Sequence, residues 1–299
     1  MDILIWIIIV IIVLGIWICT FDTSRFTVSE YEYADKRIVK SLKVVFLSDL
    51  HCKMYGPGGR FLIEKIKQIG PDLIICGGDM INARQGAKTD KVVGFLRELN
   101  GEFPIIYAYG NHELRLKIYP ENYGDVWEKY TEALSEFGLK VTENGSVKIR
   151  DSGVNIISFS AERKYYKRNV SIDMEPSYIA EKAGAPDPGS FNILLAHNPG
   201  YFDTYAAYGA DLTLSGHLHG GLVRIPVPVS KKAREEGAHV MRGLFSPRIR
   251  LFPKFDGGRF DKEGRSMIVS RGLGTHTIPV RVFNPGDLVV IDLKPHGGV

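Results

Sequence analysis

The chain starts with a long run of apolar residues. From Ile3 to Cys19 there are 17 residues without a charge, and Trp6 and Trp17 lie near the two ends of the run. A helix of this length spans roughly 26 Å, enough for the hydrocarbon core of a bilayer. A cleaved signal peptide would carry a basic start and a small-residue cleavage site, and a core helix would show a polar face. The pattern therefore favours an uncleaved transmembrane anchor over residues 1–20.

Behind this run, the first half of the chain alternates between strand and helix patterns. Residues 21–42 are polar and predict a linker that leads into the first strand. The predicted elements are strands at 43–48, 72–76 and 105–109 and helices at 61–69 and 91–99. This order predicts parallel pairing with right-handed crossovers, so the carboxyl ends of the strands meet at one edge of the sheet.

The second half of the chain predicts a second set of strands. Residues 122–137 look helical, and a hairpin with the turn Asp151-Ser152-Gly153 follows. The predicted strands are 147–150, 154–158, 191–196, 212–215, 266–270 and 288–293. There is no internal repeat and no low-complexity tract. We therefore expect one domain over residues 43–299.

Composition adds little to this picture. The chain has 299 residues with 24% charged and 44% hydrophobic residues, which is ordinary for a globular protein. The net charge of +4 is small for a nucleic-acid binder, so no specific nucleic-acid partner is predicted. The three cysteines do not suggest a disulfide framework.

The basic residues around the apolar run bear on its orientation. No Lys or Arg precedes the run, while Arg25, Lys36 and Arg37 follow it. The positive-inside rule therefore favours a single-pass protein of the cell membrane with its catalytic domain on the cytoplasmic side.

Five polar motifs follow the ends of predicted strands. They are Asp49-Leu50-His51, Gly77-Gly78-Asp79, Gly110-Asn111-His112-Glu113, Ala196-His197-Asn198 and Gly216-His217-Leu218-His219. Each motif alone usually marks a turn or a structural histidine. Together, at the carboxyl ends of strands, they predict a single metal site. Mixed imidazole and carboxylate ligands suit Mn, Fe, Zn or Co better than Ca or Mg.

The five motifs, in this order between about residues 43 and 221, resemble those of the calcineurin-like metallophosphoesterase superfamily. The segments 216–226, 251–258 and 269–274 look like a membrane-anchored bacterial branch of it, which includes transmembrane metallophosphoesterases and UDP-2,3-diacylglucosamine hydrolases. His276 departs from the pattern of that branch, where a small residue is more usual. The resemblance implies an α/β fold: a four-layer αββα sandwich of two mixed β-sheets flanked by helices, preceded by one transmembrane helix.

The resemblance also implies two divalent metal ions (Mn, Fe or Zn) and a role for each matching residue. The implied ligands are Asp49, His51, Asp79 and His219 for the first metal and Asp79, Asn111, His197 and His217 for the second, with Asp79 bridging. His112 is implied to protonate the leaving oxygen or to stabilise the phosphoryl charge without binding metal. Two metals clamp the oxygens of an in-line displacement, and a metal-bound water that loses its proton near neutral pH is the nucleophile.

A basic and apolar segment at residues 242–259 bears on the substrate. Its basic residues are Arg242, Arg248, Arg250, Lys254 and Arg259, against the one acid Asp256, and its apolar residues are Leu244, Phe245, Ile249, Leu251 and Phe252. One interpretation is a solvated loop. The other is a cap that binds a phosphate head group and meets acyl chains or the bilayer surface. The candidate substrate contacts are Arg248, Arg250, Lys254 and Arg271.

These patterns predict a membrane-anchored phosphoesterase. Its substrate would be a phosphate mono- or diester or a pyrophosphate, either a small phosphorylated molecule or a lipid-linked one resembling UDP-2,3-diacylglucosamine. A non-catalytic metal-binding scaffold is one alternative, but such a protein should have lost ligands or His112, and this chain retains them all. A nuclease is another, and it should bind nucleic acid in a strongly salt-dependent manner.

Overall fold

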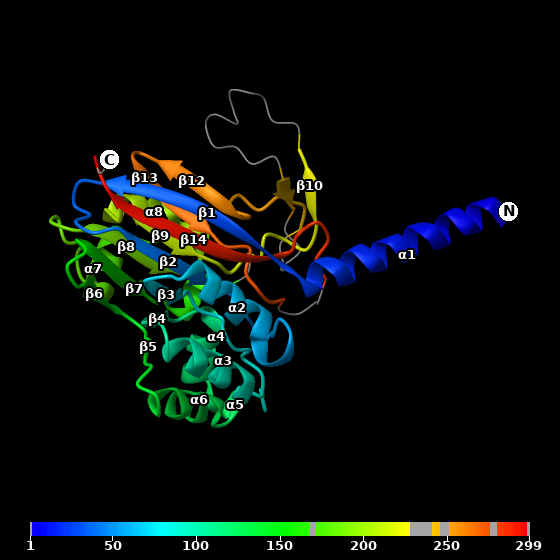
Figure 1. Ribbon diagram of the computed structural model, residues 1–299, viewed down its shortest axis with the longest axis horizontal. Helices are drawn as coiled ribbons and strands as arrows, with labels where there is room; N and C mark the ends of the chain where they lie inside the picture. Colours follow the sequence, from blue (N-terminus) through cyan, green and yellow to red (C-terminus); the bar gives the residue numbers. More distant parts are fainter. Residues whose placement is uncertain (1, 168–171, 228–240, 246–250, 276–279, 298–299) are drawn as a thin grey trace.

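The computed structural model describes residues 2–167, 172–227, 241–245, 251–275 and 280–297. Two six-stranded mixed sheets form the centre of the domain (Figure 1). The first contains, in spatial order, β1 (Phe26–Asp35), β14 (Gly286–Pro295), β2 (Leu42–Leu47), β3 (Leu73–Cys76), β4 (Ile105–Ala108) and β5 (Val141–Thr142). The second contains β12 (Gly258–Lys262), β13 (Arg265–Val269), β9 (Leu212–Ser215), β8 (Phe191–Ala196), β7 (Val154–Phe159) and β6 (Gly145–Ile149). A separate ribbon pairs β10 (Arg224–Pro226) with β11 (Met241–Gly243).

Helices cover the outer faces of both sheets and thus complete the four layers. Those near the first sheet are α2 (Arg60–Ile69), α3 (Asp90–Asn100), α4 (Asn111–Ile118), α5 (Pro120–Tyr123) and α6 (Val126–Ser135). Those on the second sheet are α7 (Pro176–Ala183) and α8 (Phe202–Tyr208). Short 3₁₀ helices occupy Pro57–Gly59 (η1), Arg163–Tyr166 (η2) and Pro199–Tyr201 (η3).

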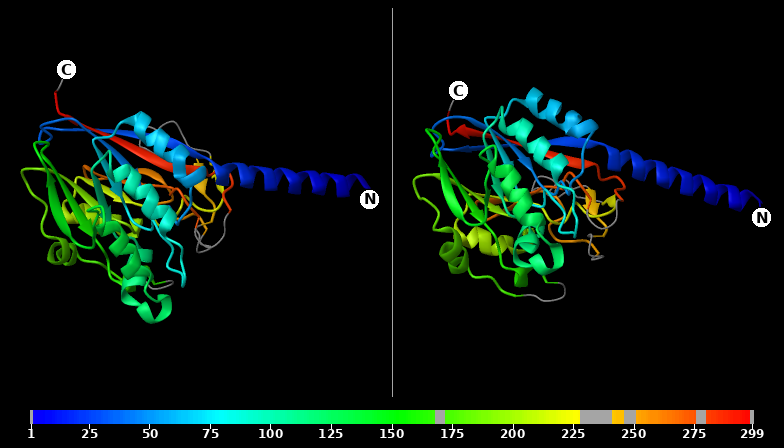
Figure 2. Two further views of the ribbon diagram at one scale, coloured as in Figure 1. Left: turned by 60° about the horizontal axis from the view of Figure 1, so that its bottom comes forward. Right: turned by 90° about the horizontal axis from the view of Figure 1, so that it is seen from below.

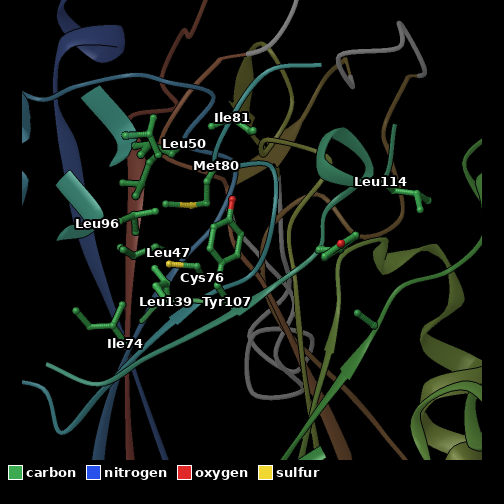
Figure 3. Packing of buried hydrophobic residues seen from close by; sticks show 14 of the residues in the cluster. Leu47, Leu50, Ile74, Cys76, Met80, Ile81, Leu96, Tyr107, Leu114 and Leu139 are labelled. Carbon is green, nitrogen blue, oxygen red and sulfur yellow. The ribbon is translucent and has the colours of Figure 1, made fainter. Parts of the chain in front are cut away.

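Side chains that point alternately to the two faces of each central strand form two apolar layers. In β2, Val44 and Phe46 belong to the cluster between the two sheets, whereas Val45 and Leu47 pack with the helices. Successive side chains of a strand point to opposite faces, so a strand buried on both sides is apolar throughout. Figure 3 shows the helix-facing layer, with Leu47, Leu50, Ile74, Cys76, Met80, Ile81, Leu96, Tyr107, Leu114 and Leu139 labelled.

The predicted strand order is confirmed where the site is built. Strands β2, β3 and β4 pair in parallel, with Val45 opposite Ile74 and Ile75 opposite Ile106. The predicted hairpin is the antiparallel pair β6–β7. Strands β2, β3 and β4 end at the same edge of the first sheet, and the parallel strands β8 and β9 end together in the second sheet, so the polar motifs that follow these strands come together.

Residues 21–42 are not a plain linker. Residues 26–35 form β1, which pairs in parallel with β14 over its whole length, from Phe26 opposite Gly286 to Asp35 opposite Pro295. Its side chains are alternately exposed and half-buried over Glu30–Asp35, as an edge strand allows. The local sequence does not identify this strand, because its partner lies about 260 residues further along the chain and only that pairing makes the segment a strand.

Helix α1 (Asp2–Ser24) projects from the domain along the long axis of the molecule (Figures 1 and 2). Among the described residues, this one helix is long and apolar enough to cross a membrane, by length and composition. It extends past residue 20, the end expected from the apolar run, to Ser24.

Candidate metal centre

The predicted site residues converge at the ends of five strands. Three overlapping groups have potential ligand atoms within 4.8 Å of one another: Asp49, His51 and His219; His51, Asp79 and His112; and Asp79, His197 and His217. All of these side chains are buried except His217, which is half-buried. Asp79 is the carboxylate shared by two groups, as expected of a bridging ligand. Asn111, the first residue of α4, is also buried.

The backbone at these positions is in a conformation that side chains rarely adopt. Five of the predicted ligands have a positive φ, and they are Asp49 (53°), His51 (49°), Asp79 (53°), His217 (72°) and His219 (54°). Non-glycine residues with a left-handed backbone are uncommon, and they cluster at active sites and ligand-binding sites, where the surrounding structure holds them in place. Neighbouring glycines make the close packing feasible: a Cβ on Gly216 would lie 2.1 Å from Asp49 Oδ2, and one on Gly110 2.2 Å from Asp79 Oδ1.

Hydrogen bonds at Nδ1 separate three ligand histidines from His112. Nδ1–H of His197 donates to the carbonyl of Gly77 (2.9 Å), and that of His219 to the carbonyl of Gly274 (3.2 Å). The bond fixes the neutral tautomer with a lone pair on Nε2, the atom that a metal needs. Nδ1 of His51 lies 2.9 Å from Oδ1 of Asn82, whose Nδ2 donates to the His51 carbonyl, so His51 has the same tautomer.

His112 has the opposite arrangement. Its Nδ1 accepts the backbone N–H of Ala83 at 2.7 Å, so the proton of its neutral imidazole is on Nε2. That nitrogen lies 4.0 Å from Asp79 Oδ2. A neutral histidine with its proton on Nε2 can donate that proton into the site but offers no lone pair there. The hydrogen bonds thus distinguish His112 from His51, His197 and His219.

The buried carboxylates of the site favour the binding of cations. Burial raises the pKa of Asp49, with Asp79 adding to the rise. Burial alone would lower the pKa of His197, but the carboxylates of Asp79 (3.1 Å from Nε2) and Asp49 (3.7 Å) outweigh it and raise that pKa to about 10. In the absence of metal, His197 thus holds a proton between two buried carboxylates, in a place that a divalent cation can take.

A buried oxygen shows that the residues fit such cations. Within the described part of the chain, Asn111 Oδ1 has no hydrogen-bond partner. Buried polar atoms are nearly always paired, so an unpaired acceptor asks for an explanation. An amide oxygen and an imidazole nitrogen beside two carboxylates form a donor set that suits transition metals.

Glu113 holds the backbone of the site in place, a role that was not predicted from the sequence. Its buried carboxylate accepts the N–H groups of Asp79 (2.8 Å), Met80 (2.9 Å) and Gly110 (3.0 Å) and the hydroxyl of Tyr107 (2.8 Å). Burial, with the nearby Asp79, raises its pKa to about 7. An acid at the third position of a helix often reaches back to the helix start, and this signal was available in the sequence.

Arg281 is a second supporting residue that the motifs do not include. Its side chain is only 1% exposed, and its Nη2 donates to the carbonyls of Arg271 (2.9 Å), Gly272 (2.9 Å) and Gly274. The Gly274 carbonyl also accepts from His219, and the Gly274 N–H donates to the carbonyl of Asp49 (2.6 Å). Arg281 therefore holds the loop that orients one ligand histidine and one ligand carboxylate.

Replacing Arg281 with lysine should loosen both the fold and the site. An ammonium cannot reach all the carbonyls of the guanidinium fork, and each unsatisfied buried acceptor costs about 1–3 kcal/mol of unfolding free energy. We expect Mn²⁺ affinity to fall by roughly 10- to 100-fold, as for other groups that orient ligands. Chemical denaturation and Mn²⁺ titration measure the two effects, with Arg150→Lys (side chain 95% exposed) as the control. A loss of stability with unchanged affinity would make Arg281 a purely structural residue.

The predicted substrate contacts that the structure describes, Arg271 and Lys254, both lie near carboxylates. Arg271 is mostly buried, and its Nη2 bonds Asp287 (2.8 Å) and the hydroxyl of Thr27 (3.0 Å). Lys254 is exposed, with Nζ 3.8 Å from Asp203. Their role toward a substrate stays a prediction. Arg248, Arg250 and His276 lie outside the described residues.

Comparison with known proteins agrees with the geometry. The calcineurin-like phosphoesterase family matches residues 42–221, more than half of the chain and the part that contains all five motifs. The chain belongs to this family. As a calcineurin-like phosphoesterase, it is a metal-dependent phosphoric ester hydrolase, and its His/Asp clusters are sites for divalent metal ions.

The relatives of this calcineurin-like phosphoesterase are distant, and the similarity covers most of this chain. The UDP-2,3-diacylglucosamine pyrophosphatase LpxG of Chlamydia muridarum is 23% identical over 84% of this chain and 83% of its own. An uncharacterized metallophosphoesterase of Aquifex aeolicus is 25% identical over 92% and 95%. Among solved structures, a dimetal phosphatase from Danio rerio is 11% identical with a TM-score of 0.41, over 81% of this chain and 90% of its own. That structural likeness is too weak to support an argument about the site.

Proposed function

We propose that the protein is a membrane-anchored phosphoesterase with two metal ions, acting on a phosphate ester or pyrophosphate carried by a membrane lipid. The observation that carries the proposal is the division of the site histidines by their Nδ1 hydrogen bonds: in His51, His197 and His219 these bonds favour the tautomer that can bind a metal through Nε2, whereas His112 has the opposite tautomer. The apolar helix α1 supports the membrane anchor. The similarity to LpxG, named as a UDP-2,3-diacylglucosamine pyrophosphatase, supports a lipid-linked substrate.

The residues divide the work as follows. Asp49, His51, Asp79 and His219 would hold one metal, and Asp79, Asn111, His197 and His217 the other. When bound, the two cations would supply Lewis acidity, lower the pKa of a water and offset phosphoryl charge. His112 holds a proton at Nε2 for the leaving oxygen. The backbone N–H of Ala83 keeps the imidazole in that tautomer, and burial excludes bulk water from the proton.

The test uses the full chain purified in detergent, with metal content measured on the same sample. With Mn²⁺, Fe²⁺ or Zn²⁺ it should hydrolyse an aryl phosphate or bis-aryl phosphate, and a chelator should abolish the activity. Among lipids, UDP-2,3-diacylglucosamine should release UMP, whereas a lipid phosphomonoester should release inorganic phosphate, so the products identify the bond that is cleaved.

Two outcomes would contradict the proposal. Tight metal binding without hydrolysis of any of these compounds would support a non-catalytic scaffold. Cleavage of DNA or RNA with steep salt dependence, and none of lipid substrates, would support a nuclease.

A further inference from the structure

The last turn of α1 is built into the catalytic domain. Asp22 is 2% exposed, and its carboxylate accepts the backbone N–H of Asn284 at 3.2 Å and the guanidinium of Arg25 at 2.7 Å. Nζ of Lys53 donates to the carbonyl of Thr23. These bonds fix the direction of α1 relative to the domain, so α1 is not a loose tether.

The level of the bilayer surface can be read from the end of α1. Trp17 and Phe21 are exposed and stack with ring centroids 5.8 Å apart, and the Arg25 guanidinium lies 4.6 Å over the Phe21 ring. Exposed aromatic rings followed by a cation are typical of the boundary between hydrocarbon and head groups. Asp22, one residue later, is already inside the domain. The domain therefore meets the bilayer surface with no spacer.

Three exposed apolar residues belong to a layer of chain segments that Asn284 joins to the base of α1. They are Leu251 (61% exposed), Phe252 (51%) and Phe283 (53%), and we call them the apolar rim. Phe283 precedes Asn284, the residue that bonds Asp22. The neighbouring segments form one layer with β10 and β11, which lie at the end of the molecule from which α1 emerges in both figures.

Backbone hydrogen bonds tie the parts of this layer together. Val282 N–H donates to Leu222 (3.0 Å), Leu222 N–H to Phe245 (2.7 Å) and Phe252 N–H to Leu244 (3.1 Å). The two edges of the layer carry Phe283 and Phe252. Both phenylalanines have a positive φ, 53° and 46°. A bulky residue in this conformation is an outlier, and here it displays an aromatic ring to the outside.

The same layer borders the metal centre. The side-chain Nδ2 of Asn284 donates to the carbonyls of His219 (2.8 Å) and Gly221 (2.6 Å). Asn284 thus connects a metal ligand, the apolar rim and the last turn of α1. A surface that lies in the head-group region would bring the metal centre to the same depth as lipid phosphates.

We propose that the apolar rim is a second membrane contact, which rests in the bilayer interface beside α1 and holds the metal centre at the level of phosphate groups carried by membrane lipids. This inference rests on the proposed anchor and lipid substrate. It commits the rim to lipid and not to a protein partner, because Asn284 joins the rim to the end of α1, the helix proposed to enter the bilayer.

The first test measures depth and needs no activity. Phe252→Trp and Phe283→Trp, in the full chain, are reconstituted into phosphatidylcholine–phosphatidylglycerol vesicles whose acyl chains are plain or brominated. The wild-type emission from the native tryptophans is subtracted. The remaining emission of each variant should be roughly twofold or more weaker in brominated vesicles than in plain vesicles. Val147→Trp, also exposed (46%) but on β6 at the opposite end of the molecule, should add unquenched emission. Equal, weak quenching at all three positions would overturn the proposal.

The second test measures the consequence. Phe252→Asn and Phe283→Asn remove the apolar ring, and asparagine tolerates the left-handed backbone, so the fold should persist. The rate on phosphatidic acid in vesicles, divided by the rate on p-nitrophenyl phosphate, should fall by roughly fivefold or more. If the variants are active and this ratio of rates is unchanged, the apolar rim is not a membrane contact. Quenching by brominated lipid in a protein inactive on both substrates would instead refute the proposed function and leave the rim in place.

Discussion

Changing Asp79 to asparagine should leave the fold intact and abolish metal-dependent hydrolysis. Asp79 Oδ1 accepts the backbone N–H of His112 at 2.7 Å, and an asparagine oxygen can keep that bond. Its Oδ2 faces His197 at 3.1 Å and His51 at 3.9 Å, in both halves of the centre. The change removes the one charge that both metals would share in the proposed centre. Because loss of a mere outer-shell partner costs about 10- to 100-fold, we expect activity below roughly 1% of wild type.

Metal content shows whether the cause is the one proposed. Asp79→Asn should bind less metal per chain than wild type, measured by elemental analysis after dialysis, while its circular dichroism should be unchanged. Asp125→Asn, a charge loss at the exposed start of α6, is the matched control and should keep full activity. Wild-type metal content combined with lost activity would remove Asp79 from the ligand set and give it a different role in the reaction.

The strands that carry ligands were predictable because their signals are local. Val44, Val45 and Phe46 form an apolar run that ends at a polar motif, and the same is true at Ile75 and Tyr107. Their parallel order follows from the helices between them. Strand β1 gave no such signal, because its pairing with β14 depends on chain segments that meet only in the folded sheet. The assignment of residues 21–42 to a linker failed for this reason.

The sequence predicts the candidate ligands but gives no signal for some of the residues that support them. Asp49 and His51 belong to a motif that directly follows a predicted strand, where sites of α/β sheets gather. Arg281 lies between Val280 and Val282 and acts through backbone carbonyls, which leave no pattern in the sequence. Asn284 likewise joins α1 to the metal centre through two backbone groups and its amide. Any residue type offers the same main-chain groups, so contacts to main-chain atoms depend on the fold and cannot be predicted from the residue types involved.

The connection through Asn284 bears on the substrate. A hydrolase anchored by a long flexible segment would sample substrates in solution, whereas Asp22 fixes this domain at the end of α1. With α1 in the bilayer as proposed, lipid head groups would then meet the site at a constant height. The anchor is thus part of the argument for a lipid-linked phosphate, in addition to the similarity to LpxG.

Removing the imidazole of His112 should lower kcat by roughly 10²- to 10⁴-fold, the usual contribution of a general acid. Metal content should stay at the wild-type level, because Nδ1 is occupied by the Ala83 N–H and Nε2 carries a proton. His112→Ala leaves that N–H unpaired, so His112→Asn is the cleaner variant, since its amide oxygen can accept the bond. Steady-state kinetics in detergent, with metal analysis of each variant, measure both effects.

Substrates with different leaving groups distinguish the two roles predicted for His112, protonation of the leaving oxygen and stabilisation of phosphoryl charge. A nitrophenolate departs without help, whereas an alkoxide needs a proton as the ester bond breaks. If His112 protonates the leaving oxygen, the loss of rate should be at least about tenfold larger for an alkyl phosphate than for p-nitrophenyl phosphate. Equal losses on the two substrates would show instead that the imidazole stabilises charge on the phosphoryl group. The hydrogen bond from Ala83 places the proton on the nitrogen that faces the site, so we expect the larger loss for the alkyl ester.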